Sequence, residues 1–419
     1  MQNKNLKKEL EALIPSYTLK ALYLCSEAAE KLSLNIYLIG GAVRDIILNK
    51  AHFDTDITVQ GNAVEFAQFL EKTFPESCKV KEIHDAFKTA KVVFFIGAEQ
   101  VEIDLASTRK ESYPHPASLP LVEEIGCNLY EDVIRRDFSI NSMALSLNQK
   151  NFCDLIDCLN GYEDLQNKVI RILHDKSFVD DPTRIIRALK FRVRFDCNLD
   201  ENTRKLQNEC LDSGKFDNLC GERIKSELKQ TFNLNRHECA EIFLAENIYR
   251  LLDANIKGDN NYCLLSEYPD FITPDFIWLI YLGTMLSDLS PEEIKQKAEC
   301  LYLTNPETEV LSGAATLVSP APILSWIDTD FSIYEFFEGF PFESIIVFLI
   351  KNPQYKDKID LYLNRLKDIK IHTTGKDLIN LGLTPGESFG KILRELLKAK
   401  VNGEFSSVEE EREFLKKLL

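Results

Sequence analysis

The chain has 419 residues, of which 45% are hydrophobic, and a formal net charge of −16. At about 150 residues per domain, this length predicts two to four domains with a sizeable core. The acidic balance argues against a protein that coats nucleic acid generally, although a local basic strip can still hold an RNA substrate.

Membrane and redox signals are few. No apolar run is long enough to cross a bilayer, and the polar N-terminal segment lacks the apolar core of a signal peptide. We therefore expect a cytoplasmic protein with no membrane partner. The 11 cysteines include no Cys-x-x-Cys, which favours reduced, buried thiols over a zinc site or a disulfide framework.

Helical and strand patterns are mixed over about the first 145 residues. Leucines at helical spacing predict helices over residues 1–33, and the apolar run 35–39 predicts a strand that stops at the tight turn Gly40-Gly41. We expect strands at residues 54–59, 90–95 and 100–105 and helices at 43–49 and 62–74. This mixture predicts an α/β or α+β head.

Strand signals fade after residue 151. Helices are expected at residues 180–195, 200–210, 222–232, 237–252, 291–303 and 340–351, with a last helical unit over 374–419. Pro-containing breaks punctuate this part of the chain. The sequence therefore predicts a head followed by an extended helical remainder.

The first candidate site is the pair Asp54 and Asp56. Residues two apart on a strand point to the same face, so these carboxylates lie side by side and repel each other unless water or a cation lies between them. Hard oxygen ligands of this kind suit Mg²⁺. Asp104 ends another expected strand and is favoured over Glu102, on the same face, as a third carboxylate. By itself, Asp-x-Asp is more typical of a solvated strand end than of a metal site.

The glycine turn that precedes this pair favours a metal and phosphate site over a solvated strand end. Gly40 and Gly41 let backbone N–H groups approach a ligand closely, and a helix that begins just after them adds a positive N-terminal dipole. Arg44 lies on its first turn. A bare strand–helix turn would explain the glycines but gives no reason for Arg44 and the nearby carboxylates. Asp45 is expected to orient Arg44 or the turn.

Two further segments are rich in charge. Residues 135–144 alternate arginine, aspartate and asparagine with apolar residues, which suits a triphosphate and a ribose as well as it suits a surface salt-bridge cluster. In residues 180–190, Pro182 fits the first turn of a helix that an aspartate caps. The basic residues that follow at spacings of three form a stripe that either binds phosphate or faces solvent: Arg184, Arg187 and Lys190.

Together these segments resemble the bacterial (class II) tRNA nucleotidyltransferase and poly(A) polymerase family, and are most similar to its CCA-adding, CC-adding or A-adding members. The matching motifs are the Gly-Gly-x-Val-Arg-Asp turn at 40–45, the Asp-x-Asp pair at 54–56, the Arg-Arg-Asp-Phe segment at 135–142 and the helix start at 180–184. The resemblance is firm over residues 35–230 and thin over 231–370.

The family implies an α+β fold: an N-terminal nucleotidyltransferase (polymerase beta-like) head with a small mixed β-sheet, followed by an elongated all-helical neck, body and tail. The implied domains are residues 1–146 (catalytic head), 147–230 (neck, base recognition), 231–360 (body, RNA binding) and 361–419 (tail, RNA binding). The implied cofactor is Mg²⁺, and the implied partners are ATP, CTP and the 3′ acceptor end of a tRNA.

The resemblance also implies roles for single residues. The catalytic metal ligands are Asp54, Asp56 and Asp104. The nucleotide-binding residues are Gly40, Gly41, Arg44, Arg136, Asp137, Asn141, Asp181, Arg184 and Arg187. Among them, Gly41, Arg44 and Arg136 match nucleotide contacts, Asp137 and Asn141 lie where the ribose is recognised, and Asp181 and Arg184 match a protein template for the base.

That template has a simple physical basis. Cytosine and adenine each carry an amino donor beside a ring-nitrogen acceptor, so Asp181 can accept from the amino group while Arg184 donates to the ring nitrogen. Uracil and guanine would place a carbonyl against the carboxylate, which is unfavourable. Two side chains can therefore select C and A.

The chain departs from the family pattern at Asp180, which replaces a glutamate, and at Lys190, which replaces an arginine and loses its bidentate fork. The implied function is addition of C and/or A to the tRNA 3′ end by attack of the RNA 3′-hydroxyl on the α-phosphate, with release of pyrophosphate. A CC-adding or A-adding enzyme, a poly(A) polymerase and an inactive RNA-binding scaffold on the same fold stay open, as does the oligomeric state.

Overall fold

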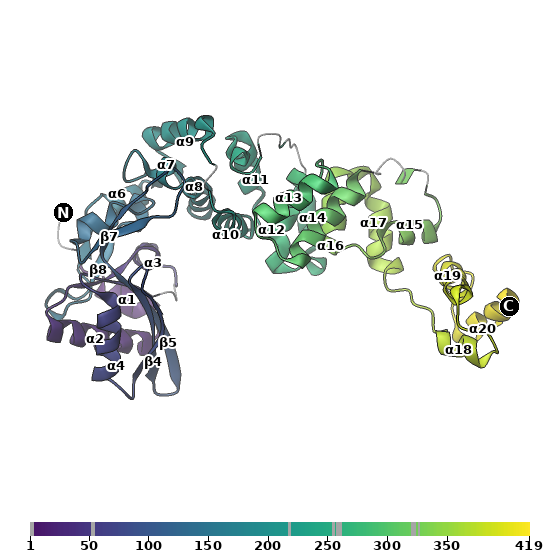
Figure 1. Cartoon of the computed structure of the whole chain (residues 1–419), viewed down its shortest axis with the longest axis horizontal. Helices are drawn as coiled ribbons and strands as arrows, with labels where there is room; N and C mark the ends of the chain where they lie inside the picture. Colours follow the sequence, from purple (N-terminus) through teal and green to yellow (C-terminus); the bar gives the residue numbers. More distant parts are fainter. Residues whose placement is uncertain are drawn as a thin grey trace. The chain divides into compact units, whose positions relative to one another are not determined.

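The head is built around a mixed β-sheet (Figure 1). The computed structural model describes residues 4–51, 55–216, 219–253, 256, 262–319, 324–325 and 327–419. Among these residues the main sheet has seven strands in the order β3-β4-β5-β2-β1-β8-β9. They are β1 (Ile36–Ile39), β2 (Asp56–Val59), β3 (Cys78–His84), β4 (Thr89–Ile96), β5 (Glu99–Ser107), β8 (Ala144–Ser146) and β9 (Leu155–Ile156). Two smaller ladders pair β6 (Arg109–Ser112) with β7 (Leu121–Ile125) and β10 (Val169–Ile170) with β11 (Asn198–Leu199).

Helices α2 (Ser16–Leu32) and α4 (Ala63–Thr73) pack against the central strands of the sheet. Strand β5 shows the consequence, because Val101, Ile103 and Leu105 are buried whereas Glu102 and Asp104 are exposed. Successive side chains of a strand point to opposite faces, so the apolar side chains face the helices and the carboxylates face away from them. The strand pattern thus separates the core from the candidate site.

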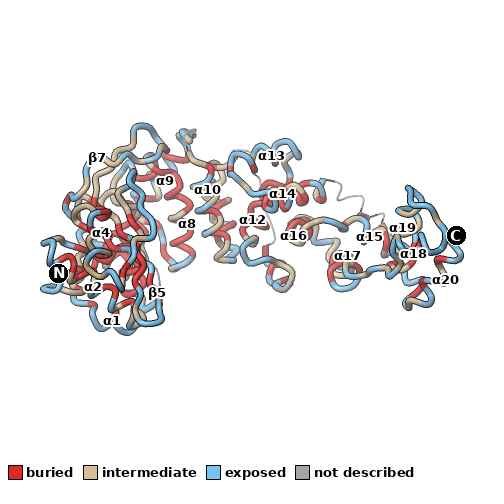
Figure 2. Tube along the Cα trace, turned by 60° about the horizontal axis from the view of Figure 1, so that its bottom comes forward, coloured by how far each residue is buried: buried red, intermediate tan, exposed pale blue. Residues whose placement is uncertain are grey.

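The remaining helices of the first half are α1 (Lys7–Leu13), α3 (Gly41–Ile47), α5 (Leu129–Val133), α6 (Gly161–Gln166), α7 (Ser177–Asp180), α8 (Thr183–Phe195), α9 (Glu201–Ser213) and α10 (Gly221–Phe232). Local sequence determines where several of them begin. Asn62 caps α4 by accepting the N–H of Val64 at 3.0 Å, and Asn128 and Glu131 form a capping box at α5. Most of α8 is buried (Figure 2).

The second half is helical. Its helices are α11 (His237–Ala245), α12 (Ile277–Leu286), α13 (Pro291–Cys300), α14 (Asn305–Val318), α15 (Asp330–Phe337), α16 (Phe342–Lys351), α17 (Lys356–Leu361), α18 (Gly375–Asn380), α19 (Glu387–Val401) and α20 (Val408–Leu418). Helices α12, α14 and α16 pack closely together. At Gly313, an added Cβ would lie 2.7 Å from the Ser344 hydroxyl, so this contact requires glycine. A separate apolar cluster that includes Leu378, Leu396 and Leu415 joins α18, α19 and α20.

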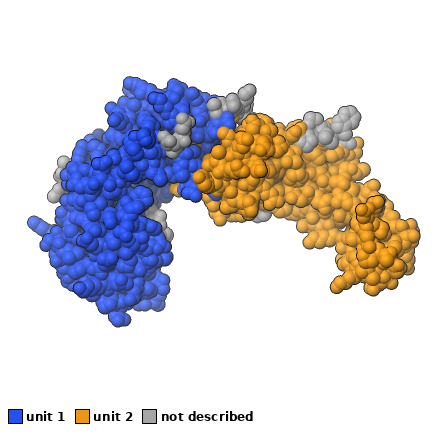
Figure 3. Space-filling view, in the orientation of Figure 1, with its two compact units in different colours: residues 1–227, 245–254 blue, residues 228–244, 255–419 orange. Residues whose placement is uncertain are grey.

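The chain divides into two compact units (Figure 3). One contains residues 1–227 and 245–254, and the other contains residues 228–244 and 255–419. The predicted finer division at residues 146, 230 and 360 stays a prediction. None of the described helices is both long and apolar enough to span a bilayer.

The predicted α+β class is confirmed, since a mixed sheet lies near the N-terminus and helices dominate the remainder. The sequence missed β3, whose residues are mostly exposed, and α12, which is buried on all sides and therefore lacks an amphipathic period. The helix expected over 237–252 ends at Ala245, and Asn247 adopts a left-handed conformation (φ 58°).

Candidate active site

Two of the predicted carboxylates are brought together by strand pairing. Strands β2 and β5 are parallel neighbours, and their register places Asp56 directly beside Asp104. Neighbouring strands lie about 4.8 Å apart and paired residues share a face, so the two carboxylates stand next to each other on the side that α2 and α4 do not cover. Both residues are exposed. The third predicted ligand, Asp54, lies outside the described residues.

A hollow of about 270 Å³ opens over this face of the sheet. It is lined by Asp56 and Asp104, together with Thr58, His84 and Lys91. The Lys91 ammonium lies 3.4 Å from the carboxylate of Asp104 and 3.6 Å from that of Glu102. The charge of Asp104 raises the pKa of Lys91. The hollow therefore contains a positive charge beside its carboxylates.

The glycine turn reaches the same edge of the sheet. Strand β1 runs antiparallel to β2 with Leu38 opposite Ile57, so the next residues, Ile39 and Gly40, arrive at the level of Asp56. Gly40 has φ 76°, a conformation that side-chain-bearing residues rarely adopt. Helix α3 begins at Gly41. The predicted strand, turn and helix are thus confirmed, and they meet the carboxylate pair.

Arg44 lies inside the protein rather than at the mouth of the turn. It is only 3% exposed, and its guanidinium donates to Asp45 at 2.9 Å and to Asn141 at 2.6 Å. Its central carbon lies 4.5 Å from the ring centroid of Phe195. Burial lowers the pKa of Arg44, against the opposing effect of Asp45. The expected orienting role of Asp45 agrees with this contact, whereas a contact of Arg44 with phosphate stays a prediction.

Arg136 covers the carboxylate face. Its guanidinium donates to Thr58 at 3.3 Å and to Asp132 at 2.9 Å, and it lines the same hollow as Asp56. Asp132 is fully buried and also accepts from Arg135 at 2.7 Å. This buried anchor shows that the segment is more than a surface salt-bridge cluster.

Asp137, the residue after Arg136, contacts α8 rather than the sheet. It accepts hydrogen bonds from Asn141 at 3.1 Å and from both Nε and Nη2 of Arg187, at 3.0 Å and 2.8 Å. Burial alone would raise the pKa of Asp137, but the charge and hydrogen bonds of Arg187, the hydrogen bond of Asn141 and the charge of Arg184 together outweigh it, so the pKa falls to about 2. Asp137 is therefore ionised at neutral pH and holds α8 against the head.

The three cations predicted to form a basic stripe on α8 do not form a solvent-exposed one. Arg184 and Lys190 are buried, and Arg187 is partly buried. Glu227 on α10 accepts from Arg187 at 2.7 Å and from Lys190 at 2.9 Å. Because buried charges are costly unless paired, this carboxylate explains why the cations can lie inside.

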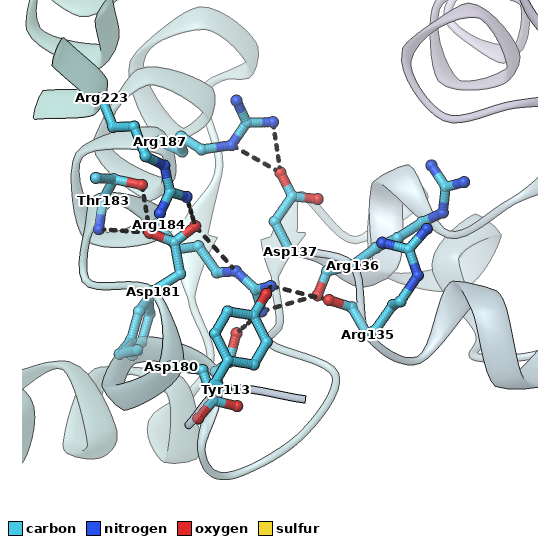
Figure 4. A network of polar contacts seen from close by, with 12 residues as sticks. Tyr113, Arg135, Arg136, Asp137, Asp180, Asp181, Thr183, Arg184, Arg187 and Arg223 are labelled. Atoms are coloured by element: carbon cyan, nitrogen blue, oxygen red, sulfur yellow. Dashed lines mark hydrogen bonds and ion pairs between the residues drawn. The ribbon is translucent and has the colours of Figure 1, made fainter. Parts of the chain in front are cut away.

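Asp181 and Arg184 face each other at the start of α8 (Figure 4). One oxygen of Asp181 accepts from the backbone N–H of Thr183 at 3.2 Å and from its hydroxyl at 2.6 Å. The second oxygen accepts from Arg223 and lies 3.8 Å from Nε of Arg184. The contacts to Thr183 are those expected of an aspartate that caps a helix start.

Comparison with known proteins identifies the first part of the chain. Residues 36–171 match the family model "Poly A polymerase head domain". This part of the chain is thus similar to a poly A polymerase head domain. The predicted family resemblance is thereby confirmed, and the matched residues contain Asp56, Asp104 and Arg136.

Relatives of the whole chain carry related names. An A-adding tRNA nucleotidyltransferase of Geobacter sulfurreducens is 32% identical over 95% of this chain and 47% of its own length. One of Halalkalibacterium halodurans is 28% identical over 94% of this chain and 92% of its own length. The structure of a Thermotoga maritima CCA-adding enzyme complexed with tRNA matches the whole of both chains with a TM-score of 0.79 at 27% identity. The chain spans about half the length of the first of these curated relatives.

Several residues of the head domain and its neighbouring helices were not singled out by the sequence. Asp132 precedes Arg135 and Arg136 by three and four residues, a helical spacing that could have indicated the pairs. Lys91 carried no comparable local signal, because its partner Asp104 lies on another strand.

One partly buried histidine, His174, adjoins the residues at the start of α8. The Nδ1 atom of His174 lies 4.0 Å from the carboxylate of Asp180, one of the departures from the family pattern. Burial, followed by the positive charge of Arg184, lowers the pKa of His174 to about 4. Burial also raises the pKa of Asp180. The histidine is therefore neutral at pH 7.

Proposed function

We propose that this chain is a metal-dependent nucleotidyltransferase that adds A, C or both, from ATP and CTP, to the 3′ end of a tRNA. The observation that supports it most directly is the in-register pair Asp56 and Asp104, which lies beside the Gly40 turn in a hollow that Arg136 also lines. The names of the relatives support the choice of substrate. A cytoplasmic location follows from these proposed substrates.

The donor set fits a divalent cation. Asp56 and Asp104 offer hard carboxylate oxygens side by side at an open hollow, as Mg²⁺ prefers when it also binds substrate phosphates. Among the described residues no three metal-binding side chains cluster, and Asp54 is the proposed third ligand. When bound, Mg²⁺ would lower the pKa of the RNA 3′-hydroxyl and neutralise charge at the α-phosphate.

Residues of the chain would position the nucleotide around that point. Arg136 lies over the carboxylates with its guanidinium at the hollow, where it would contact the triphosphate. The backbone of Gly40 and Gly41 would approach the same phosphates. We propose that the ribose lies against Asp137 and Asn141, and that Arg44 and Arg187 hold these two polar side chains in place, in addition to the nucleotide contacts predicted for them.

The base would lie against Asp181 and Arg184, and we propose that residues 147–230 serve this recognition. Residues 231–360 and 361–419 are proposed to hold the tRNA, mainly through phosphate and shape contacts. A-only addition is the more specific candidate, because A-adding relatives from Geobacter sulfurreducens and Halalkalibacterium halodurans each match at least 94% of this chain.

The test is incorporation of labelled ATP or CTP, with Mg²⁺, into tRNAs that lack one, two or all three nucleotides of the CCA end. We expect ATP to be added to the tRNA that ends in CC. Addition of C to shorter tRNAs would identify a full CCA-adding enzyme, and unlimited A addition would identify a poly(A) polymerase. No incorporation into any RNA would overturn the proposal in favour of an RNA-binding scaffold.

A further inference from the structure

The ring of Phe191, on α8, lies against three cations. The residue is 5% exposed. Its ring centroid lies 5.1 Å from the central guanidinium carbon of Arg44, 5.5 Å from that of Arg187 and 5.3 Å from Nζ of Lys190. A cation within about 6 Å of a ring centroid is attracted by the negative face of the ring, and the attraction is larger where water is excluded. Phe191 therefore stabilises charges that are otherwise costly to bury.

Two of these cations hold opposite ends of one polar pair, Asn141 and Asp137. Arg44 comes from α3 and donates to the side-chain oxygen of Asn141 at 2.6 Å. Arg187 comes from α8 and donates to Asp137 at 3.0 Å and 2.8 Å (Figure 4). The amide of Asn141 in turn donates to Asp137 at 3.1 Å. The four side chains thus form a chain of hydrogen bonds, and the arginines at its two ends both contact Phe191.

Phe191 also contacts the segment that carries the polar pair. Its ring lies edge-to-face with Phe138, the residue after Asp137, with centroids 5.9 Å apart and ring planes at 90°. Phe138 itself is fully buried. Because edge-to-face contacts between aromatic rings are directional, this contact fixes the direction in which the ring of Phe191 faces. The same ring is therefore held against the polar segment of the head and against both arginines.

The neighbouring ring, Phe195, has a different set of cations. Among the residues that the structure describes, they are Arg44 at 4.5 Å, Lys50 at 4.9 Å and Arg194 at 5.1 Å. Phe195 is also more exposed than Phe191. Phe195 therefore supports one end of the hydrogen-bonded chain, whereas Phe191 supports both ends.

The polar pair retains capacity for a ligand hydroxyl. Among the described residues, the side-chain oxygen of Asn141 accepts from Arg44, and a carbonyl oxygen has two lone pairs, so one is left. We propose that Phe191 is a positioning residue for ribose recognition, because it holds Arg44 and Arg187, and through them the polar pair, in the orientation that binds the 2′-hydroxyl of the incoming nucleotide. This inference rests on the proposed function, since it assumes that a ribonucleoside triphosphate is the substrate.

The test compares addition of ATP and of 2′-deoxy-ATP to a tRNA that ends in CC, and replaces Phe191 with phenylalanines that carry one, two or three ring fluorines. Fluorine withdraws negative charge from the ring face but changes the size of the ring little, so the cation contacts weaken stepwise while packing is retained. We expect the wild-type protein to prefer ATP by roughly 10- to 100-fold in kcat/KM. This preference should fall with each fluorine, by about tenfold in total. A preference that is independent of fluorination overturns the proposal.

Substitutions separate positioning from a general loss of packing. Phe191→Leu should lower kcat/KM for ATP by about tenfold but change that for 2′-deoxy-ATP little, because this substrate lacks the hydroxyl. Phe195→Leu should have a smaller effect of the same kind, since it removes a contact with only one of the two arginines. Phe66→Leu is the control for packing, because Phe66 is fully buried on α4; it should lower the urea midpoint without changing the preference for ATP. Equal losses for both nucleotides in Phe191→Leu would overturn the proposal.

The outcomes also separate this inference from the proposed function. If the wild-type protein adds no nucleotide to any tRNA, the proposed function fails. If it adds A but does not distinguish ATP from 2′-deoxy-ATP, or distinguishes them equally well with a trifluorinated ring at position 191, only the positioning role of Phe191 fails.

Discussion

Two charged regions of the first compact unit differ in how their charges are balanced. At the sheet, Asp56 and Asp104 lie side by side on an exposed face, and Lys91 is the cation recorded beside Asp104. Around α8, Asp137 and Glu227 are paired closely with Arg187 and Lys190 and shielded from water. We expect an added cation to stabilise the first region, whereas side chains of the protein itself pair the charges of the second.

The difference shows what each region can do. Adjacent carboxylates at an open hollow repel each other and attract metal and substrate phosphate, which suits chemistry. A network that is already paired holds helices in register and leaves only particular donors and acceptors for recognition. Substitutions in the two regions should therefore affect different measurements, activity in the first and stability in the second.

The largest expected effect is at the sheet. Asp56→Asn and Asp104→Asn should each reduce nucleotide incorporation by about a thousandfold, because a metal ligand and its transition-state stabilisation are lost. Single-turnover incorporation with Mg²⁺ measures this, and urea unfolding should be unchanged or shifted to higher urea, since repulsion is relieved. Glu102→Gln, on the same face of β5, is the matched control and should retain activity. Near-normal activity in Asp104→Asn would contradict the proposed role of this carboxylate as a metal ligand.

The next effect concerns the buried network. Asp137→Asn leaves Arg187 without one of its two carboxylates and should reduce the free energy of unfolding by about 3 kcal/mol. Urea denaturation at pH 7 is the measurement. The double variant Asp137→Asn/Arg187→Gln should recover part of the loss, because the stranded charge is removed. If Asp137→Asn alone lowers the free energy of unfolding by less than about 1 kcal/mol, the pair is screened by solvent like a surface ion pair.

A smaller effect should appear on acidification. His174 titrates at about 4 in the folded chain and near 6.5 when unfolded, so between these values the unfolded chain binds more protons. Stability contributed by neutral His174 is therefore present at pH 7 and falls as the pH decreases through this window, by roughly 1–2 kcal/mol at pH 5. His174→Gln should reduce the shift in urea midpoint between pH 7 and pH 5. An identical shift in both proteins would exclude His174 as its source.

The smallest effect concerns Lys91, the cation beside Asp104. Lys91→Met removes the positive charge 3.4 Å from Asp104 and should lower the Mg²⁺ concentration needed for half-maximal incorporation by a few-fold. Lys81→Met is the matched control, because Lys81 pairs with Glu102 on the same sheet. A higher Mg²⁺ requirement in Lys91→Met would show that Lys91 supports substrate binding instead.

The strand, the turn and the outward-facing carboxylates of the candidate site could be predicted, because each follows from the pattern of residues that are close together in the sequence. An apolar run that ends at Gly40 gives a strand and a turn, and alternation along β2 and β5 places Asp56 and Asp104 on the solvent side. Cross-strand pairing of these two residues was not predictable in the same way. This pairing follows from the strand order β5-β2-β1, which cannot be derived from the pattern of a single sequence.

By itself, the sequence determined most elements around the site and the faces of β2 and β5 that their residues occupy, because backbone geometry imposes periods of two and 3.6 residues on local patterns. Only the tertiary structure decided which charges meet. Arg184, Arg187 and Lys190 looked like one exposed stripe, yet they are held by the carbonyls of the head and by Glu227, nearly 40 residues away for Lys190. The pairing of Arg223 with Asp181 arises in the same way, since ion pairs depend on distances between elements and not on spacing within them.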